Sequence, residues 1–323
     1  MKRNDFLKQL GMLTGGSLLL AESALASPGL WKLPKLVKQL GIQLFSLPKM
    51  LEADFEATIA MLSKMGYSEI ELFGPYTFSA PSAQERWKAV TPMLGFNGSG
   101  YFGLREQEVK AIFKAHQITI PSMHTDLDTL ENHMESLGNA GQALGATYVV
   151  LPAIPDERRQ TLDDYKAMAD TFNKIGKSAK EVGLKFAYHN HGYGLSPVDG
   201  QIPLHLILDH TDPELVFLEM DIFWTIAGKA DPIAYLKKYK NRYHLMHVKD
   251  MKEHQTFSGD GGDAAQWIAL FPNMASCGEG VLDLEAIIPA ALDNGVKHFF
   301  VEQDMVADPE VALKKSSTYL SKL

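Results

Sequence analysis

Residues 165–190, YKAMADTFNKIGKSAKEVGLKFAYHN, contain one complete unit of the fold that the sequence predicts. Apolar residues recur at helical spacing over 165–182, and Gly183 follows where a helix commonly ends in a left-handed residue. The run LKFAYHN at 184–190 then has the composition of a buried strand, and it ends in polar side chains. A helix that leads into a strand with a polar end is the unit that the rest of the chain repeats.

The repetition of this unit predicts the fold class. Short runs rich in β-branched or aromatic residues also occur at 41–45, 69–73, 118–124, 147–151, 216–221, 243–249 and 298–302. Amphipathic stretches lie between them at 55–65, 106–115, 134–144 and 284–294, with Gly66, Gly145 and Gly295 just past three of the four. Eight strand–helix alternations favour an α/β protein with a single (β/α)8 barrel domain.

An open, doubly wound sheet is the alternative architecture. It usually has a glycine-rich phosphate-binding loop after its first strand, whereas here the first run is followed by SLPK at 46–49. Two long gaps, 74–105 and 250–280, carry Gly, Pro and Ser residues. We expect them to be enlarged loops after the second and seventh strands, and so part of an active-site rim.

Composition excludes several classes of protein. The 323 residues are 46% apolar and 22% charged, which is typical of a globular domain and argues against coiled coil, collagen or general disorder. The formal net charge of −8 provides no basic surface for nucleic acid. The single cysteine, Cys277, cannot form an internal disulfide, and there is no cysteine cluster for zinc. Eleven histidines direct attention to histidine and carboxylate chemistry instead.

The N-terminus has the pattern of a cleavable export signal. Lys2, Arg3 and Lys8 precede a short apolar run at 10–21, and the sequence ALA at 24–26 matches a cleavage site. The run is too short to span a bilayer, which needs about 20 apolar residues. We therefore expect a signal peptide at 1–26, a linker at 27–37 and a barrel at 38–323, with a periplasmic location and no stable membrane insertion after cleavage. The leader is similar to a Tat signal with one arginine in place of two, so Tat and Sec export both remain open.

Polar residues gather where the predicted strands end. Within each strand they share one parity, so in a closed barrel they would all face the interior, at the end where barrel enzymes have their active sites. They are Gln43, Glu71, His124, His189, His191, Glu219, Asp221, His247, Lys249, Glu302 and Asp304. So many buried polar groups are costly unless they are paired or bind a ligand, which predicts a functional site.

The residue types indicate which chemistry this site performs. Imidazole and carboxylate ligands suit a divalent ion such as Mn, Co, Fe or Zn. Such an ion polarises a substrate carbonyl and acidifies the adjacent C–H bond, so that a carboxylate can move the proton. No G-x-S-x-G nucleophile motif is present. Taken singly, His189 is compatible with a hydrogen-bonded core histidine, and Trp224 with either packing or a platform for the face of a sugar.

Several short motifs occur together in a fixed order. They are YHNH (188–191), EMDIFW (219–224), DP (231–232), HVKD (247–250), GEG (278–280) and VEQD (301–304). With them the chain resembles the sugar phosphate isomerase/epimerase family of the xylose isomerase-like TIM barrel superfamily, and in particular its exported bacterial members. The resemblance runs from about residue 38 to residue 320. It implies a (β/α)8 barrel with one divalent metal at the C-terminal mouth.

The resemblance also implies residue roles. Metal ligands come from strands five to eight, at the positions of His189, Asp221, His247 and Glu302. Many relatives have a glutamate on strand five, and others have one three residues after the His-Asn-His sequence, where this chain has Gly194. The fourth ligand is thus open between His189 and His191, and a weak or absent metal remains an option.

We expect a metal-dependent isomerase or epimerase, or a related lyase or dehydratase, that abstracts a proton next to the carbonyl of a sugar or keto-sugar. Glu302 and His189 are the expected catalytic residues. The expected substrate-binding residues are Gln43, Glu71, His124, His191, Glu219, Trp224 and Lys249. The metal is one of Mn, Co, Fe, Zn or Mg.

Other functions stay open at this point. Because a strand-five glutamate is lacking, a mechanism with one base is favoured over symmetric epimerisation. The alternatives are an AP-endonuclease-like metal phosphodiesterase and a non-catalytic carbohydrate-binding barrel. The expected partner is a small carbohydrate and not nucleic acid. The sequence leaves the oligomeric state open, with a homodimer as one option.

Overall fold

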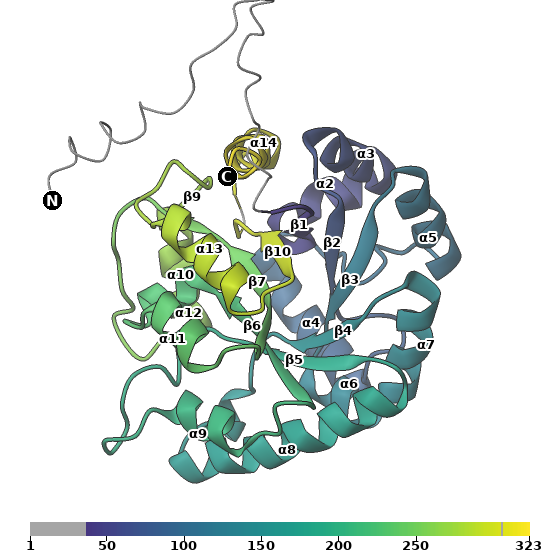
Figure 1. Cartoon of the computed structure of the whole chain (residues 1–323). Helices are drawn as coiled ribbons and strands as arrows, with labels where there is room; N and C mark the ends of the chain where they lie inside the picture. Colours follow the sequence, from purple (N-terminus) through teal and green to yellow (C-terminus); the bar gives the residue numbers. More distant parts are fainter. Residues whose placement is uncertain (1–36, 305) are drawn as a thin grey trace, which may run out of the picture. The chain divides into compact units, whose positions relative to one another are not determined.

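Eight parallel strands close into a barrel in the computed structural model, which describes residues 37–304 and 306–323. The ring order is β1-β10-β7-β6-β5-β4-β3-β2 (Figure 1). The strands are β1 Leu40–Gln43, β2 Glu69–Phe73, β3 Thr119–His124, β4 Tyr148–Leu151, β5 Lys185–His189, β6 Val216–Asp221, β7 Tyr243–Val248 and β10 His298–Val301. Each predicted strand is found, so the (β/α)8 barrel is confirmed and the open sheet is wrong.

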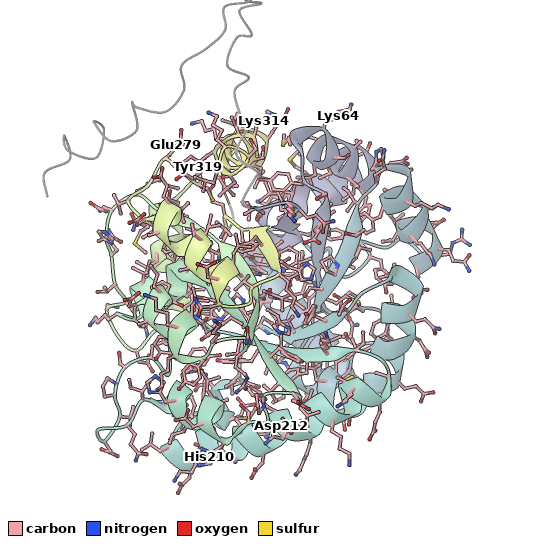
Figure 2. All side chains as sticks on the ribbon, in the orientation of Figure 1. Lys64, His210, Asp212, Glu279, Lys314 and Tyr319 are labelled. Carbon is pink, nitrogen blue, oxygen red and sulfur yellow. The ribbon has the colours of Figure 1, made fainter. Side chains whose placement is uncertain are left out.

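Helices surround the strands in Figure 1. They are α2 Pro48–Ala53, α3 Phe55–Met65, α4 Pro81–Leu94, α5 Glu106–Ala115, α6 Leu127–Asn132, α7 Met134–Leu144, α8 Leu162–Glu181, α9 Pro203–His210, α10 Ile222–Ala227, α11 Pro232–Lys238, α12 Ala264–Leu270, α13 Leu284–Asp293 and α14 Pro309–Leu320. Helices α3, α5 and α7 have the predicted bounds. Figure 2 shows side chains crowding the space among these elements, while the exposed His210 and Asp212 lie at the outer edge.

Helix α8 illustrates how the sequence sets these elements. Thr161 caps its N-terminus in a capping box with Asp164, whose carboxylate in turn accepts from the backbone N–H of Thr161. Its buried face includes Met168, Phe172 and Ile175, which pack against the barrel. The chain then turns at Gly183, with φ at +82°, and enters β5. The other predicted helix-ending glycines, Gly66, Gly145 and Gly295, also have positive φ.

The enlarged loops lie after β2 and β7, as predicted. The first contains α4, and the second contains α12, a 3-10 turn at Phe271–Asn273, and a small antiparallel pair of β8 Asp250–Met251 with β9 Met274–Ala275. The carboxylate of Asp250 accepts hydrogen bonds from the backbone N–H groups of Gly278, Gly280 and Leu282, at 2.9, 3.0 and 3.1 Å. The sequence motifs HVKD and GEG therefore meet in one structural unit that closes this loop.

An apolar layer fills the lower half of the barrel interior. It consists of Tyr148, Val150, Ala187, Leu245 and Phe300, with Phe217 packed against it. Gly41 of β1 pairs with Phe300 of β10, and a methyl group at position 41 would overlap the Phe300 ring. The absence of a side chain at Gly41 thus makes room for the largest member of this layer.

A break in register places His244 beside the apolar layer. The pairing of β6 with β7 passes from Leu218↔Tyr243 to Glu219↔Leu245, which leaves His244 without a partner residue on β6. Its ring stacks on Phe217 with centroids 4.2 Å apart, and Nδ1 lies 3.0 Å from the Tyr148 hydroxyl. Burial, together with Lys297 and Lys185, lowers the pKa of His244 from its ordinary value of 6.5 to about 4.

The position of His244 predicts a pH-dependent loss of stability. The pKa of His244 is lower in the folded protein than in the unfolded chain, so the unfolded chain binds a proton more readily. The contribution of His244 to the free energy of unfolding is therefore complete above pH 6.5 and is lost as the pH falls toward 4. We expect His244→Phe to be less stable than the parent at pH 7.5, because the Tyr148 hydroxyl loses its partner. The deficit should shrink or reverse at pH 4.5. Urea unfolding at both pH values measures this, and a deficit that does not change between them contradicts the assignment.

The predicted leader and almost all of the predicted linker precede the part of the chain that the structure describes. The predicted signal peptide at 1–26 and all but the last residue of the predicted linker at 27–37 lie outside the described residues. Within the described part, no helix combines the length and apolar character needed to cross a lipid bilayer.

Candidate active site

The barrel brings the predicted polar residues together at the C-terminal ends of its strands. Alternation of side chains along each strand places them above the apolar layer, on the same interior parity as Leu245 and Phe300. All but His191 are buried, in most cases completely: Gln43, Glu71, His124, His189, Glu219, Asp221, His247, Lys249, Glu302 and Asp304. Their assembly in one place is as expected, while their individual roles stay predictions.

His247 lies at the centre of this group, between two carboxylates. Its Nε2 is 2.6 Å from Glu71 Oε2, and its Nδ1 is 2.8 Å from Glu302 Oε2. Burial alone disfavours a charged imidazole, but Glu219, Glu302 and Glu71 raise the pKa of His247 well above its usual range. Gln43 completes the arrangement by donating from Nε2 to Glu71 at 2.8 Å. The ring orientation of His247 is therefore fixed from both sides.

The other two deeply buried histidines share the carboxylate of Glu219. Its Oε2 is 2.7 Å from His124 Nε2 and 3.0 Å from His189 Nδ1. Burial, together with its neighbour Glu71, raises the pKa of Glu219 to about 7. His189 differs from His124: burial and the nearby cationic side chains hold its pKa well below the usual range, so it is neutral. A neutral imidazole anchored through Nδ1 leaves Nε2 available as a metal ligand.

Asp221 has one oxygen fixed and one free. Its Oδ1 accepts from the backbone N–H of Trp224 at 2.9 Å and so caps α10. No group of the described residues donates a hydrogen bond to its buried Oδ2. Lys249 Nζ lies 3.0 Å from this oxygen, but without hydrogen-bond geometry, and His189 Nε2 lies 3.8 Å away. Oδ2 therefore points into this group of polar side chains, where it accepts no hydrogen bond but lies beside the Lys249 ammonium.

Lys249 forms ion pairs with three carboxylates. Its Nζ is 2.6 Å from Asp304, 2.7 Å from Glu302 and 3.0 Å from Asp221. Burial opposes the ammonium charge, but these three carboxylates raise the pKa of Lys249 well above its usual range. Lys249 therefore remains charged and holds Glu302 and Asp304 in place.

A cavity of about 440 Å³ opens above this group. Its polar floor is formed by Gln43, His124, His189, His191, His247, Glu302 and Asp304. Glu71, Glu219, Asp221 and Lys249 are not among the lining side chains; they are buried and contact the floor residues from behind. Three of the residues predicted to bind substrate, Glu71, Glu219 and Lys249, therefore lie behind the residues that line the cavity.

The walls of the cavity were largely missed from the sequence. They are aromatic and aliphatic, with Trp224 the only wall residue that the sequence indicated. The others include Phe45, Phe73, Trp87, Trp267 and Phe271. His191 stands between floor and wall, with its ring centroid 4.2 Å from that of Trp267 and 5.9 Å from that of Trp224. The available signal was the position of Trp87 and Trp267 in the two enlarged loops.

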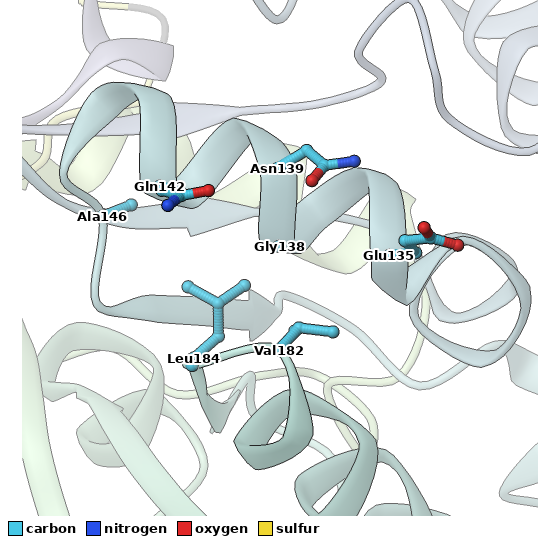
Figure 3. Close-up of a pocket in the computed structure, with 8 residues that line it drawn as sticks. Glu135, Gly138, Asn139, Gln142, Ala146, Val182 and Leu184 are labelled. Atoms are coloured by element: carbon cyan, nitrogen blue, oxygen red, sulfur yellow. The ribbon is translucent and has the colours of Figure 1, made fainter.

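A second hollow lies on the outside of the barrel, where α7 packs against the turn between α8 and β5 (Figure 3). Gly138 and Gly141 allow this close approach, since a methyl group on them would crowd Val182 and Leu184. Glu135 is the one titratable residue in its lining. This hollow has no group of side chains comparable to the floor of the barrel cavity.

Comparison with known proteins agrees with this architecture. The model of the xylose isomerase-like TIM barrel family matches residues 59–323. The chain belongs to the xylose isomerase-like TIM barrel family. A sugar phosphate isomerase/epimerase from Parabacteroides distasonis has the same fold as this family member, with a TM-score of 0.69 and 21% identity over 93% of this chain and 98% of that one.

Curated relatives of this xylose isomerase-like chain are inosose dehydratases. One from Bacillus cereus is 32% identical over 162 residues, 48% of this chain and 53% of the relative. Another from Clostridium perfringens is 28% identical over 232 residues, 65% of this chain and 75% of the relative. The chain spans about half or less of the length of the first curated relatives that it matches. A further structure with this fold is that of the IOLI protein with a bound zinc atom, with a TM-score of 0.59 and 15% identity over 88% of this chain and 95% of that one.

The residues of this family member fit a metal ion. Ligand atoms of Asp221, His247 and Glu302 all lie within 4.8 Å of one another, and those of His124, His189, Glu219 and His247 form a second such set. The buried Oε1 atoms of Glu71 and Glu219 lack hydrogen-bond partners among the described residues, whereas Asp221 Oδ2, which also accepts no hydrogen bond, lies 3.0 Å from the ammonium of Lys249. Unpartnered buried carboxylate oxygens are costly without a cation. Asp221, His247 and Glu302 are the residues that would hold the ion; His189 belongs to the other set, and its Nε2 lies 3.8 Å from Asp221 Oδ2.

Two neighbouring carboxylates on one strand end allow a matched test of this site. Glu302→Gln removes a ligand charge, and we expect it to weaken Mn²⁺ or Zn²⁺ binding at least about tenfold. Asp304→Asn removes a carboxylate that also contacts Lys249 but belongs to neither ligand set, so its affinity should stay near that of the parent. Calorimetric titration of the metal-free protein measures both. Equal losses in the two variants would mean that overall charge, and not ligation, holds the ion.

Proposed function

We propose that this chain is a metal-dependent enzyme that moves a proton next to the carbonyl of a sugar or keto-sugar, as an isomerase, epimerase or dehydratase. One observation carries the proposal. Asp221, His247 and Glu302 converge at the floor of a cavity at the C-terminal mouth of the barrel, the end where barrel enzymes perform chemistry. The naming of curated relatives as inosose dehydratases supports it.

The floor residues are suited to handle a proton. When bound, a divalent ion would polarise the substrate carbonyl and acidify the neighbouring C–H bond. Glu302 lines the cavity and is the base in this proposal. Burial tends to raise the pKa of Glu302, but Lys249 and His247 hold it below its usual range. Glu302 is therefore ionised, but its lowered pKa makes it a weak base, so proton removal would require strong acidification of the C–H bond.

His124 is positioned to return a proton. It lines the same cavity, and although burial opposes its charge, Glu71 and Glu219 raise its pKa to about 9. At neutral pH this imidazole therefore carries a proton that it can donate to a departing hydroxyl or to an enolate oxygen. A base on β10 and an acid on β3 match what elimination or isomerisation needs.

The arrangement favours a single-base reaction over symmetric epimerisation. Epimerisation with two bases needs carboxylates on opposite faces of the substrate. Glu302 and Asp304, which line the floor, come from the same strand end, while Glu71 and Glu219 are buried behind the histidines. The other carboxylate of the lining, Asp126, caps α6 through Thr129 and pairs with Arg86. A dehydratase or aldose–ketose type of isomerase is the reaction class that we propose within the broader function.

Solvent exchange tests the proposed chemistry. A base that works next to a carbonyl should introduce deuterium from D2O into an inosose or keto-sugar, and only with the divalent ion present. Glu302→Gln keeps the shape of the side chain but removes the base, so exchange measured at a metal concentration that saturates the variant should fall by roughly 10²–10⁴-fold. Mass spectrometry of the recovered substrate measures the incorporated deuterium.

Two variants control this experiment. Glu69→Gln alters a buried carboxylate below the apolar layer, where it pairs with His298 at 2.9 Å, and exchange should continue. Asp304→Asn should keep both the metal and exchange. If Asp304→Asn abolishes exchange while Glu302→Gln does not, the base is Asp304 and the assignment of Glu302 is wrong.

We also propose that the chain is exported to the periplasm and that its leader is cleaved after Ala26. The support is the order of basic residues, short apolar run and ALA sequence at 24–26. The mature protein recovered from cells should begin at Ser27, which N-terminal mass spectrometry can establish. An intact Met1 on the cellular protein contradicts export by cleavage.

A further inference from the structure

The upper walls of the active-site cavity differ sharply from its floor. Two helices of the enlarged loops, α4 and α12, supply apolar side chains to them: Ala83, Trp87, Val90, Met93, Leu94, Ala264, Trp267 and Ile268. Phe45, Phe73, Trp224 and Phe271 extend this surface toward the floor. The floor thus suits a polyhydroxylated ring, whereas the walls have few groups with which a hydroxyl could bond.

The polar atoms of the two wall tryptophans are already used. Trp87 donates its indole N–H to the carbonyl of Asn97 at 2.7 Å, and Trp267 donates its own to the carbonyl of Gly261 at 2.6 Å. Each ring is thereby fixed against its own loop. The surfaces that remain to meet a ligand in the cavity are carbon surfaces.

The wall also lacks a free charge for an anionic ligand. Arg86 of α4 lines the cavity, but its guanidinium lies 3.1 Å from Asp128 and 3.6 Å from Asp126. Two carboxylates therefore already neutralise it. A phosphate bound beside α4 would have to displace Asp126 and Asp128 from Arg86.

Exposed apolar residues concentrate at this mouth. Among the described residues, the large apolar side chains with high exposure are Val90, Met93, Val198, Ile268, Val281 and Val311. Three of these, Val90, Met93 and Ile268, line the cavity, and Met93 is 63% exposed. Apolar surface that stays exposed at one place, next to a polar floor, is typical of a ligand-binding site.

We propose that these walls form a subsite for an uncharged apolar group, and that the ligand is a glycoside whose sugar reaches the floor and whose aryl aglycone packs between α4 and α12. The inference rests on the proposed function, whose site it extends. The cavity volume of about 440 Å³ lies within the range of roughly 300–1,000 Å³ that accommodates larger small molecules. A second sugar fits less well, because most of its hydroxyls would face carbon surfaces; the polar lining residues outside the floor are Thr125 and the paired Arg86 and Asp126.

A comparison of two glycosides tests the subsite on its own. Phenyl β-glucoside should bind about ten- to a hundredfold more tightly than methyl β-glucoside, since burying the ring removes on the order of 100 Å² of apolar surface from water. Tryptophan fluorescence or calorimetry measures both affinities. Equal affinities, undetectable binding of both, or tighter binding of cellobiose than of the phenyl glycoside overturns the proposal.

Exposed positions provide variants that leave the core intact. Met93→Ser and Ile268→Ser, combined, should reduce the phenyl-to-methyl preference at least about fivefold. Val311→Ser on α14 removes a similarly exposed valine that does not line the cavity, and the preference should not change. A preference that survives the double substitution, or a change of oligomeric state in that variant only, overturns the proposal; the latter would identify the mouth as a contact between copies of the chain.

The apolar subsite and the proposed proton chemistry can be tested independently of each other. Glu302→Gln should lose deuterium exchange yet keep the phenyl-to-methyl preference, because it leaves the walls unaltered. Exchange without a phenyl preference refutes the subsite only. A phenyl preference without exchange on any keto-sugar refutes the chemistry only.

Discussion

The imidazole of His247 links two sets of buried charges, and the arrangement of the barrel mouth depends on it. On one side lies Glu71, which also contacts His124, and on the other lies Glu302, which also contacts Lys249. A charge buried in the interior is costly unless a partner of opposite sign lies beside it. Removal of His247 would therefore leave carboxylates on both sides without their shared partner. The geometry of each floor residue follows from this mutual dependence.

Much of this arrangement could be predicted from the sequence because strands alternate with period two. Once Leu245 faces the barrel interior, His247 and Lys249 must face it too, and the same rule applies to Glu219 and Asp221 on β6. The alternation of side chains along each strand thus identified which polar residues face the barrel interior. It could not identify which imidazole contacts which carboxylate. Those contacts depend on side-chain rotation and on the register between strands, which pairs Asp221 with His247.

The apolar walls could not be predicted in the same way. Trp87 and Trp267 lie in loops, where no periodicity relates a residue to the barrel axis. Their orientation depends on contacts such as the hydrogen bond from Trp87 to Asn97, which forms only once the loop has folded back on itself. His244 illustrates a different limit, since a break in strand register, invisible to a parity rule, brings its ring against Phe217. In both cases tertiary structure overrides the local pattern.

The layers of side chains inside the barrel give a physical reason for placing the reaction at the C-terminal ends of the strands. Below the polar residues, Tyr148, Leu245 and Phe300 pack without room for solvent, with Gly41 accommodating the Phe300 ring. Above them, aromatic walls narrow the access of water to the floor. An electrostatic interaction is stronger where the surrounding medium is apolar, so Lys249 and the imidazoles act on nearby carboxylates more strongly than they would in water. An apolar group of a ligand held between α4 and α12 would close the remaining opening. The same walls that select such a ligand would then also strengthen the charges that act on its sugar.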